Sequence, residues 1–479
     1  CSMIDYGKQK STVRPEELEL TETKVFVSSN ITEVNEDETD GQPGFTGYEF
    51  DLIEYDKDEY IKIQAEKNAD LENEIINSAP FQRLRNVKQL AMTYLVFHGA
   101  EHTRFGHSIG VMHLVTRAFD SAVSNGSYSF SDEKYAWYKQ LLRLIALTHD
   151  LGHAPFSHAS EAVFPDGLEH EDFTEKIVKE TIIATHIKAI GATFVEKYGP
   201  EYDITPELIC DIYRGRLPGE NSEFTFLKSF MDSELDCDKM DYLLRDSLFC
   251  GVKYGNYDIE RLLSSLTIYI QDGCPRLAIG SGGTQVFEEF VLARYFMFVQ
   301  VYFHRTRRFF DIMFSQALKC ILPDGTYPQD VNDYLMWDDC RVIQELKAHV
   351  DDNDACANIV KRVVYSCANE SVTHPKSGDR NEFKLISLQA KEKFGAENFL
   401  EDYSAGKMPH KIPIKSEIDD EKAIVIIHKS TGKITTISEE SPIIQSLTNK
   451  IDIQRLYVKP SLYETVSQYL REIYAAIQS

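Results

Sequence analysis

The sequence predicts a mainly α-helical protein with a small C-terminal α+β lobe. Apolar residues recur at helical spacing through roughly the first 350 residues. Beyond about residue 370 the pattern changes to short β-branched runs separated by turn-rich segments. A chain of 479 residues, 43% of them hydrophobic, is long enough for one large core with an appended lobe. These observations together favour a helical core followed by a mixed lobe.

The N-terminal region begins with two segments of different character. Residues 1–46 are polar and acidic, and we expect a loosely packed arm. Residues 47–63 alternate aromatic and apolar side chains with acids, which predicts strands or a hairpin. From Ile75 to Gly99 the apolar residues return at helical spacing. We therefore expect the helical domain to occupy 47–350.

Helices are predicted through the rest of this core. The periodic stretches are Arg104 to Ser121, Glu133 to Leu151, His170 to Lys197, Thr205 to Tyr213, Phe224 to Phe249, Ile259 to Leu266 and Gln285 to Cys320. The α+β lobe is expected over 370–479. Its predicted elements are strands at Ala423–Lys429, Lys433–Ile437 and Ile453–Lys459 and a helix from Leu462 to Gln478.

Composition disfavours several classes of protein. The net charge of −25 argues against extended, sequence-independent binding of nucleic acid, although a local cluster of cations can still hold a small phosphate ligand. The longest apolar stretches, such as Leu141 to Thr148, are too short to span a bilayer, and no secretory signal is expected. Nine unpatterned cysteines argue against a disulfide framework. We expect a cytoplasmic protein that does not bind membranes.

Histidines and aspartates that suit a metal gather in three segments. His149 and Asp150 end an otherwise apolar helix, where a buried carboxylate is costly unless it is paired or binds a metal. Taken alone, a histidine at a helix end is more often a cap than a ligand. The helix containing Asp238 fits a plain amphipathic helix equally well. The combination of these segments with His107, in RFGHSIG, favours a metal centre.

These segments, in this order, resemble the HD superfamily of phosphohydrolases. More narrowly, they resemble its deoxynucleoside triphosphate triphosphohydrolases, which include the vertebrate SAM-and-HD-domain enzyme and bacterial relatives. The resemblance rests on PFQRLRNVKQL, VFHGAEHTRFGHSIGV, THDLGHAPFSH, LDCDKMDYLLRD and RYFMFVQVYFHR. It implies an HD-domain helical core and one divalent metal ion held by His107, His149, Asp150 and Asp238. Two imidazoles and two carboxylates are compatible with iron, manganese, zinc, nickel or magnesium, and magnesium could also accompany the substrate phosphates.

The resemblance also implies roles around the metal. His153 and His170 would act at the scissile phosphate, and Glu161 stands where the vertebrate enzyme has an aspartate that partners these histidines. Contacts with the nucleotide are implied for Gln89 and Leu90 at sugar and base, Arg104, His158, Lys239 and Arg294 at the phosphates, and Tyr242, Tyr302 and Asp246 at the sugar. The spacing of Asp238, Lys239, Tyr242 and Asp246 agrees, because these positions can share one stripe of a helix.

The reaction implied is hydrolysis of a deoxynucleoside triphosphate to deoxynucleoside and triphosphate, by attack of a metal-bound water on the α-phosphorus. An HD-type nuclease or phosphatase for oligonucleotide ends or other nucleotides stays open. A non-catalytic nucleotide sensor is the third alternative, and it predicts the loss of a metal ligand or catalytic histidine that this chain retains.

Regulation and assembly are expected from the same resemblance. A nucleotide effector would bind near Arg85. Asn77 stands where the vertebrate enzyme has an aspartate that recognises guanine, and an amide presents a donor as well as an acceptor, so the effector need not be a guanine nucleotide. We expect a homo-oligomer, from dimer to tetramer.

Overall fold

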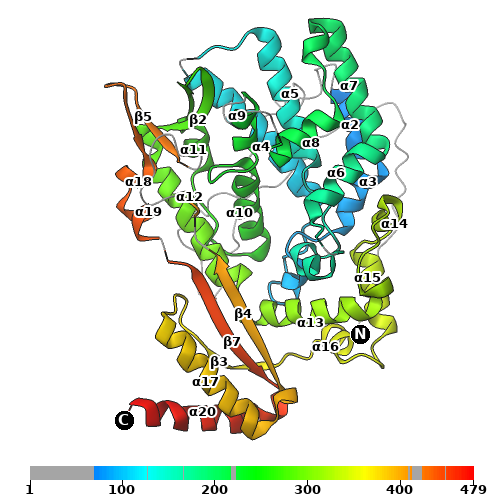
Figure 1. Ribbon diagram of the computed structural model, residues 1–479, viewed down its shortest axis with the longest axis vertical. Helices are drawn as coiled ribbons and strands as arrows, with labels where there is room; N and C mark the ends of the chain where they lie inside the picture. The colour runs from blue at the N-terminus through cyan, green and yellow to red at the C-terminus, as the bar shows by residue number, and fades with distance from the viewer. Residues whose placement is uncertain are drawn as a thin grey trace, which may run out of the picture. The chain divides into compact units, whose positions relative to one another are not determined.

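The computed structural model describes residues 69–478, except 127, 166, 217–222, 408–409, 413–422 and 448. The described residues from Asp70 onward form one compact unit, which is mostly helical (Figure 1). The predicted arm at 1–46 and the strands predicted in 47–63 lie outside the described residues. Over the described ranges, no helix combines the length and apolar character that a membrane span needs.

The predicted mainly α-helical fold is confirmed. Its long elements are α2 (Ala69–Asn77), α4 (Arg104–Asn125), α5 (Asp132–Thr148), α6 (His170–Glu180), α7 (Ile182–Tyr198), α8 (Pro206–Arg214), α9 (Glu223–Ser229), α10 (Cys237–Cys250), α11 (Ile259–Ser265), α12 (Thr284–Met297), α13 (Arg305–Ile321), α15 (Asp339–Ala348) and α16 (Asp354–Val360). Shorter turns are α3 (Ala79–Gln82), η1 (Arg83–Asn86), η2 (Ala91–Leu95), η3 (Ser157–Val163), α14 (Val331–Leu335) and the π-helical η6 (Phe298–Tyr302).

Local capping sets where these helices begin and end. Asp236 precedes α10, and its carboxylate accepts a hydrogen bond from the backbone N–H of Lys239. The same helix ends at Gly251, whose φ of 67° lies in the left-handed region that glycine adopts without strain. Gly215 ends α8 in the same way.

Four predicted helices are interrupted. The stretch from His170 to Lys197 divides at Thr181, which has an extended backbone and accepts a hydrogen bond from Ile183 N. The stretch Phe224–Phe249 divides into α9 and α10, and Gln285–Cys320 divides into α12, η6 and α13. Ile75–Gly99 forms short helical turns in place of one helix. Apolar periodicity predicted the buried faces and missed these breaks because they depend on capping and turn contacts.

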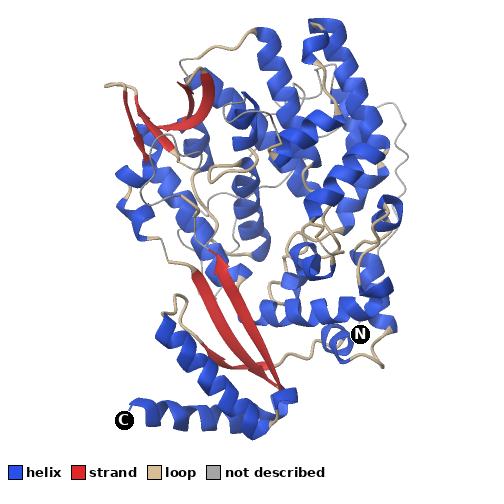
Figure 2. Ribbon diagram, in the orientation of Figure 1, coloured by secondary structure: helices blue, strands red, loops and turns tan. Residues whose placement is uncertain are grey.

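Two small sheets complete the fold (Figure 2). One has the order β1-β2-β5-β6, from β1 (Leu266–Gln271), β2 (Cys274–Gly280), β5 (Val425–His428) and β6 (Lys433–Thr436). The other has the order β3-β7-β4, from β3 (Ser366–Glu370), β4 (Phe399–Lys407) and β7 (Ile451–Val458). The remaining helices are α17 (Ser377–Phe394), α18 (Ile437–Glu440), α19 (Pro442–Ser446) and α20 (Tyr463–Gln478).

The predicted C-terminal α+β lobe is confirmed. The strands β5, β6 and β7 and the helix α20 match the predicted segments, whereas β1 to β4 and α17 were not predicted. Because β5 pairs with β2 in parallel, part of the C-terminal sequence joins a hairpin from the helical region.

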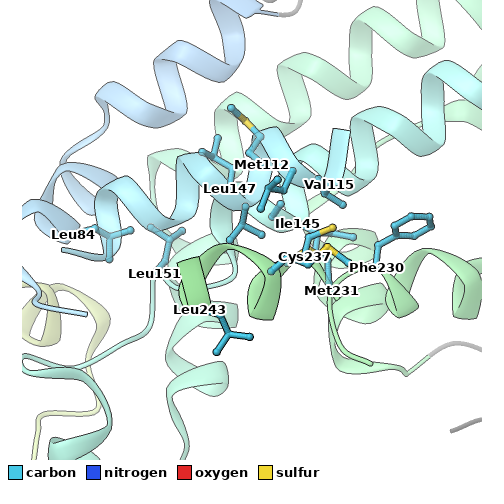
Figure 3. Close-up of a cluster of buried hydrophobic side chains, with 14 of the residues drawn as sticks. Leu84, Met112, Val115, Ile145, Leu147, Leu151, Phe230, Met231, Cys237 and Leu243 are labelled. Carbon is cyan, nitrogen blue, oxygen red and sulfur yellow. The ribbon is translucent and has the colours of Figure 1, made fainter. Parts of the chain in front are cut away.

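A shared hydrophobic core holds α4, α5 and α10 together. Val115 of α4, Ile145 and Leu147 of α5, and Leu243 of α10 are at most 1% exposed (Figure 3). Fully burying side chains of this size contributes roughly 1.5–3 kcal/mol each. A smaller cluster around Ile386 packs α17 and α20 against β7. The larger core therefore fixes the three helices that carry the predicted metal ligands.

Candidate metal centre and active site

The packing of α4, α5 and α10 brings the predicted metal ligands into one cluster. Ligand atoms of His107, His149 and Asp238 all lie within 4.8 Å of one another. Asp238 Oδ1 is 2.9 Å from His107 Nε2 and 3.7 Å from His149 Nε2. Asp150 lies beside them, with Oδ1 3.3 Å from His149 Nε2 and Oδ2 3.6 Å from His107 Nε2.

The far nitrogen of each imidazole is anchored to an acceptor. His107 donates from Nδ1 to Asp241 Oδ2 at 2.7 Å, and His149 donates from Nδ1 to the carbonyl of Ala146 at 2.7 Å. Because these bonds hold the ring protons at Nδ1, each Nε2 can present a lone pair to the cluster. His149 Nε2 is buried, and none of the described residues forms a hydrogen bond with it. This donor set fits a divalent transition metal ion.

The pKa shifts in the cluster also favour a bound divalent cation. Burial lowers the pKa of His107, but hydrogen bonds to Asp238 and Asp241 outweigh burial and raise this pKa to about 10. Although burial also opposes ionisation of Asp150, the positive charge of Arg104 and the nearby imidazoles hold the pKa of this carboxyl well below its usual range. Surroundings that favour an extra proton on His107 equally favour a divalent cation between the carboxylates.

Two glycines allow backbone segments to approach these side chains. A Cβ atom on Gly110 would lie 2.0 Å from Asp241 Oδ1, and one on Gly152 would lie 2.0 Å from the carbonyl oxygen of His170. Both distances are far below van der Waals contact. Gly110 therefore lets α10 pack against α4, and Gly152 lets the start of α6 reach the turn that follows α5.

A cavity of ≈ 1220 Å³ opens beside the cluster. The predicted residues that line it are Gln89, Leu90, Arg104, His149, Asp150, His153, His158, Glu161, His170, Asp238, Lys239, Tyr242, Asp246 and Tyr302. His107 is buried behind this surface, with 1% of its side chain exposed. The volume is ample for a ligand of nucleotide size.

Three histidines form one part of the cavity wall. The rings of His153 and His170 stack with centroids 4.0 Å apart, and His158 meets both edge-on. Glu161 Oε1 lies 2.5 Å from His158 Nδ1 and 3.3 Å from His170 Nδ1. Desolvation raises the pKa of Glu161, but these two hydrogen bonds outweigh desolvation and hold this pKa well below its usual range. Burial and the charge of Arg104 lower the pKa of His153 well below its ordinary value.

The ligand atoms of these three histidines also lie within 4.8 Å of one another. However, the planes of His153 and His170 differ by only 19°, so their in-plane lone pairs do not converge on one ion. The arrangement suits proton transfer better than a second metal. The nearer partner of Glu161 is His158, which the sequence placed among the phosphate contacts.

The residues predicted at the sugar also come together. Tyr302 donates its hydroxyl proton to Asp246 Oδ2 at 2.7 Å, and His102 Nε2 lies 2.8 Å from Asp246 Oδ1. Tyr242 meets Tyr302 edge-on, with ring centroids 6.3 Å apart. Tyr302 is on η6, whose π-helical turn shifts its side chain from ordinary α-helical spacing.

Each cation predicted at the phosphates already has an acidic partner. Arg104 donates to Asp150 Oδ2 at 2.5 Å. Lys239 Nζ donates to Asp236 Oδ2 at 2.5 Å. Arg294 is absent from the cavity lining, and its Nη1 lies 2.9 Å from Glu234 Oε2. Phosphate contact by these side chains would require them to share or exchange their partners.

The residues predicted to bind an effector lie elsewhere. Arg85 donates from Nε to Gln82 Oε1 at 2.8 Å, and its guanidinium packs 3.6 Å from the centre of the Phe105 ring. Asn77 is the last residue of α2. Neither lines the cavity, and their role in regulation stays a prediction.

Sequence reasoning missed three supporting residues. Asp241 follows Asp238 by one helical turn, so helical spacing alone could have indicated it. Arg83 donates to the carbonyl oxygen of His153 at 3.0 Å across 70 positions, and His102 contacts Asp246 across 144 positions. No local pattern indicates those two contacts.

Matches to known proteins cover most of the chain. The model of the HD domain matches residues 104–223, and that of the HD associated region matches 257–474. The chain is 30% identical over 403 residues to the uncharacterized protein YwfO of Bacillus subtilis, covering 79% of this chain and 85% of that protein. A solved structure of a hypothetical protein from Aquifex aeolicus is 33% identical, with a TM-score of 0.68, and the match covers 84% of this chain and 95% of that one.

Other relatives have named activities. The chain is 33% identical over 212 residues to the deoxynucleoside triphosphate triphosphohydrolase of Gallus gallus, which covers 40% of this chain and 33% of that protein. HD domains bind divalent metal ions, and this chain carries a His–Asp cluster suited to one. The chain therefore belongs to the HD-domain phosphohydrolases, a family of hydrolytic enzymes.

Proposed function

We propose that this protein hydrolyses deoxynucleoside triphosphates to deoxynucleoside and triphosphate. One observation carries the proposal: the His–Asp cluster, the three histidines and the Asp246–Tyr302 pair share one cavity. Similarity to deoxynucleoside triphosphate triphosphohydrolases supports the class of substrate.

His107, His149, Asp150 and Asp238 would hold the divalent ion. When bound, that ion supplies a Lewis acid that polarises a phosphoryl oxygen and lowers the pKa of water. Arg104 lies at the boundary between this cluster and the cavity, since it donates to Asp150 and also to Ser157 Oγ at 2.7 Å. Its guanidinium would neutralise charge on the α-phosphate.

The three histidines of the cavity wall would supply the proton that the leaving group needs. Cleavage between the α-phosphorus and the 5′-oxygen leaves an alkoxide, which must gain a proton as it departs. His158 and His170 both contact Glu161 through Nδ1, so Nε2 of either can donate while the carboxylate stabilises the imidazolium. His153 would stay neutral and hold His170 in place by stacking.

The other predicted contact residues would bind the rest of the nucleotide. Lys239 on the cavity wall, and Arg294 outside the lining, would balance the β- and γ-phosphates on exchanging their acidic partners, and Tyr242 would pack under the sugar. Asp246 would accept the 3′-hydroxyl, while Gln89 and Leu90 would lie beside the sugar and base. Leu90 and Tyr302 would leave no room for a 2′-hydroxyl, so ribonucleotides should be poor substrates.

Product analysis tests the proposal. The purified protein is incubated with each of the four dNTPs, and separately with ATP, in the presence of Mn²⁺, Mg²⁺ or Fe²⁺, and the products are separated by ion-exchange chromatography. Equal release of triphosphate and deoxynucleoside supports the proposal. Release of pyrophosphate or orthophosphate without triphosphate contradicts it. Shortening of an oligonucleotide with intact dNTPs would favour the nuclease alternative.

A further inference from the structure

His102 joins parts of the cavity wall that are distant in the sequence. Its Nε2 lies 2.8 Å from Asp246 Oδ1, and the two side chains are 3% and 2% exposed. Its backbone carbonyl accepts a hydrogen bond from Gln89 N at 3.1 Å. Two residues later Arg104 begins α4. One buried residue therefore contacts both Gln89 and Asp246, and the proposed function places both of these beside the nucleoside.

The contact holds the carboxylate of Asp246 in one orientation. Tyr302 donates to Oδ2 and His102 occupies Oδ1, so neither oxygen can turn away without breaking a bond. Each carboxylate oxygen has two acceptor sites, so one site on each oxygen stays available for a ligand hydroxyl. Without His102, Oδ1 would be a buried acceptor that lacks this partner.

The His102 ring is itself held by packing. It stacks on Phe249, with centroids 4.6 Å apart and ring planes 20° apart, and Phe249 follows Asp246 by one turn of α10. A Cβ atom on Gly99 would lie 2.4 Å from the carbonyl oxygen of Phe249, so glycine allows the preceding loop to reach this end of α10. His102 Nδ1 is buried without a hydrogen-bond partner among the described residues. Within the described part of the chain, the imidazole therefore donates to Asp246 alone.

We infer that His102 is a positioning residue that makes the enzyme selective for nucleotides with a 3′-hydroxyl. It sets the orientation in which Asp246 accepts that hydroxyl, and it does not touch the reacting phosphorus. This inference rests on the proposed function and extends it to the sugar. A structural role alone would lower activity on every nucleotide, whereas this role affects only substrates that carry the 3′-hydroxyl.

Matched variants separate these possibilities. His102→Gln can place an amide nitrogen near the position of the imidazole Nε2, whereas the shorter amide of His102→Asn cannot. His102→Phe keeps a ring against Phe249 and removes the donor. His98→Ala is the control, because His98 is an exposed histidine of the same loop. For each protein, kcat and KM are measured with dATP and with 2′,3′-dideoxyATP, and Tm reports folding.

The wild-type protein should prefer dATP over dideoxyATP by about 10- to 100-fold in kcat/KM, the range for a hydrogen bond to a charged group. In His102→Phe and His102→Asn this ratio should fall towards one, mainly through a higher KM for dATP. His102→Gln should retain most of the preference, and His98→Ala all of it. If His102→Phe does not fold, the comparison of His102→Asn with His102→Gln decides.

Two results would overturn the inference: a wild-type ratio near one, or an unchanged ratio in folded His102→Phe and His102→Asn. Either leaves triphosphate release from dATP intact. Failure of the wild-type protein to release triphosphate from dATP would instead contradict the proposed function, and the inference would fall with it. The product assay on the wild-type protein therefore distinguishes the two failures before any variant is compared.

Discussion

His107 donates its Nδ1 proton to Asp241 at 2.7 Å, and this bond directs Nε2 of the imidazole towards Asp238. Arg245 donates to both oxygens of the same carboxylate, at 2.7 and 2.8 Å. Asp241 is therefore fixed before any metal binds. A carboxylate behind a histidine ligand holds the ring tautomer and raises its basicity.

Removing this carboxylate should weaken metal binding. We expect Asp241→Asn to lower the affinity for a divalent ion by about 10- to 100-fold, because the ring loses its anionic partner. Isothermal titration calorimetry with the divalent ion measures the change in affinity. Glu260→Gln, at an exposed ion pair with Arg117, is the control. Unchanged affinity in a folded Asp241→Asn protein would contradict the proposed support.

Metal binding should also stabilise the fold. An ion that binds only the folded state at 100 times its Kd adds about 2.7 kcal/mol to the free energy of unfolding. Protein stripped with a chelator should therefore show a lower Tm, which rises again as the ion is restored. Asp238→Ala should remove most of this rise. A metal-induced shift of equal size in the variant would place the ion elsewhere.

Replacing Glu161 should slow the chemical step. In Glu161→Gln, His158 and His170 lose the carboxylate that stabilises their protonated form. We expect kcat to fall by about 10²-fold or more, the usual contribution of general acid–base catalysis, with little change in KM. Steady-state kinetics with a dNTP gives both constants, with Glu180→Gln on the exposed side of α6 as the control. A higher KM with unchanged kcat would assign Glu161 to binding.

Asp339 should make stability depend on pH. Its two oxygens accept hydrogen bonds from the backbone N–H groups of Lys88 and Phe156, at 2.9 and 2.8 Å. Burial raises the pKa of Asp339 from 3.8 to about 7 despite these bonds. Because the folded state holds the proton more tightly, this contribution to stability is complete below about pH 4 and is lost as pH rises towards 7.

The loss should approach about 1.4 kcal/mol for each pH unit between these limits. Asp339→Asn has no proton to lose, so the free energy of unfolding of the wild-type protein should fall relative to the variant from about pH 4 to 7. Denaturant titrations of both proteins across this range give the difference. A difference that does not vary with pH would show that Asp339 stays ionised in the folded protein.

The helices near the proposed metal ligands were predictable, since apolar residues recur at helical spacing in α4 and α5, although the C-terminal half of α5 is buried on all sides. The proposed metal ligands were predicted for a different reason, because the motifs that contain them follow one another in an order that resembles the HD superfamily. The break at Thr181 and the parallel pairing of β2 with β5 were not predictable. Both depend on contacts that apolar periodicity does not encode.

By itself, the sequence determined the helical class, and its resemblance to the HD superfamily singled out His107, His149, Asp150 and Asp238, which the structure brings together. The helical class follows from apolar spacing within single helices, whereas the site residues were assigned from the order of motifs that resembles the HD superfamily. The pairs Lys239–Asp236 and His158–Glu161 are local, three residues apart. Only the tertiary structure decided that His102 contacts Asp246 across 144 positions and that Arg104 pairs with Asp150 across 46. Such contacts depend on how α4, α5 and α10 pack around a common core, because packing places side chains within hydrogen-bonding distance whatever their separation in the chain.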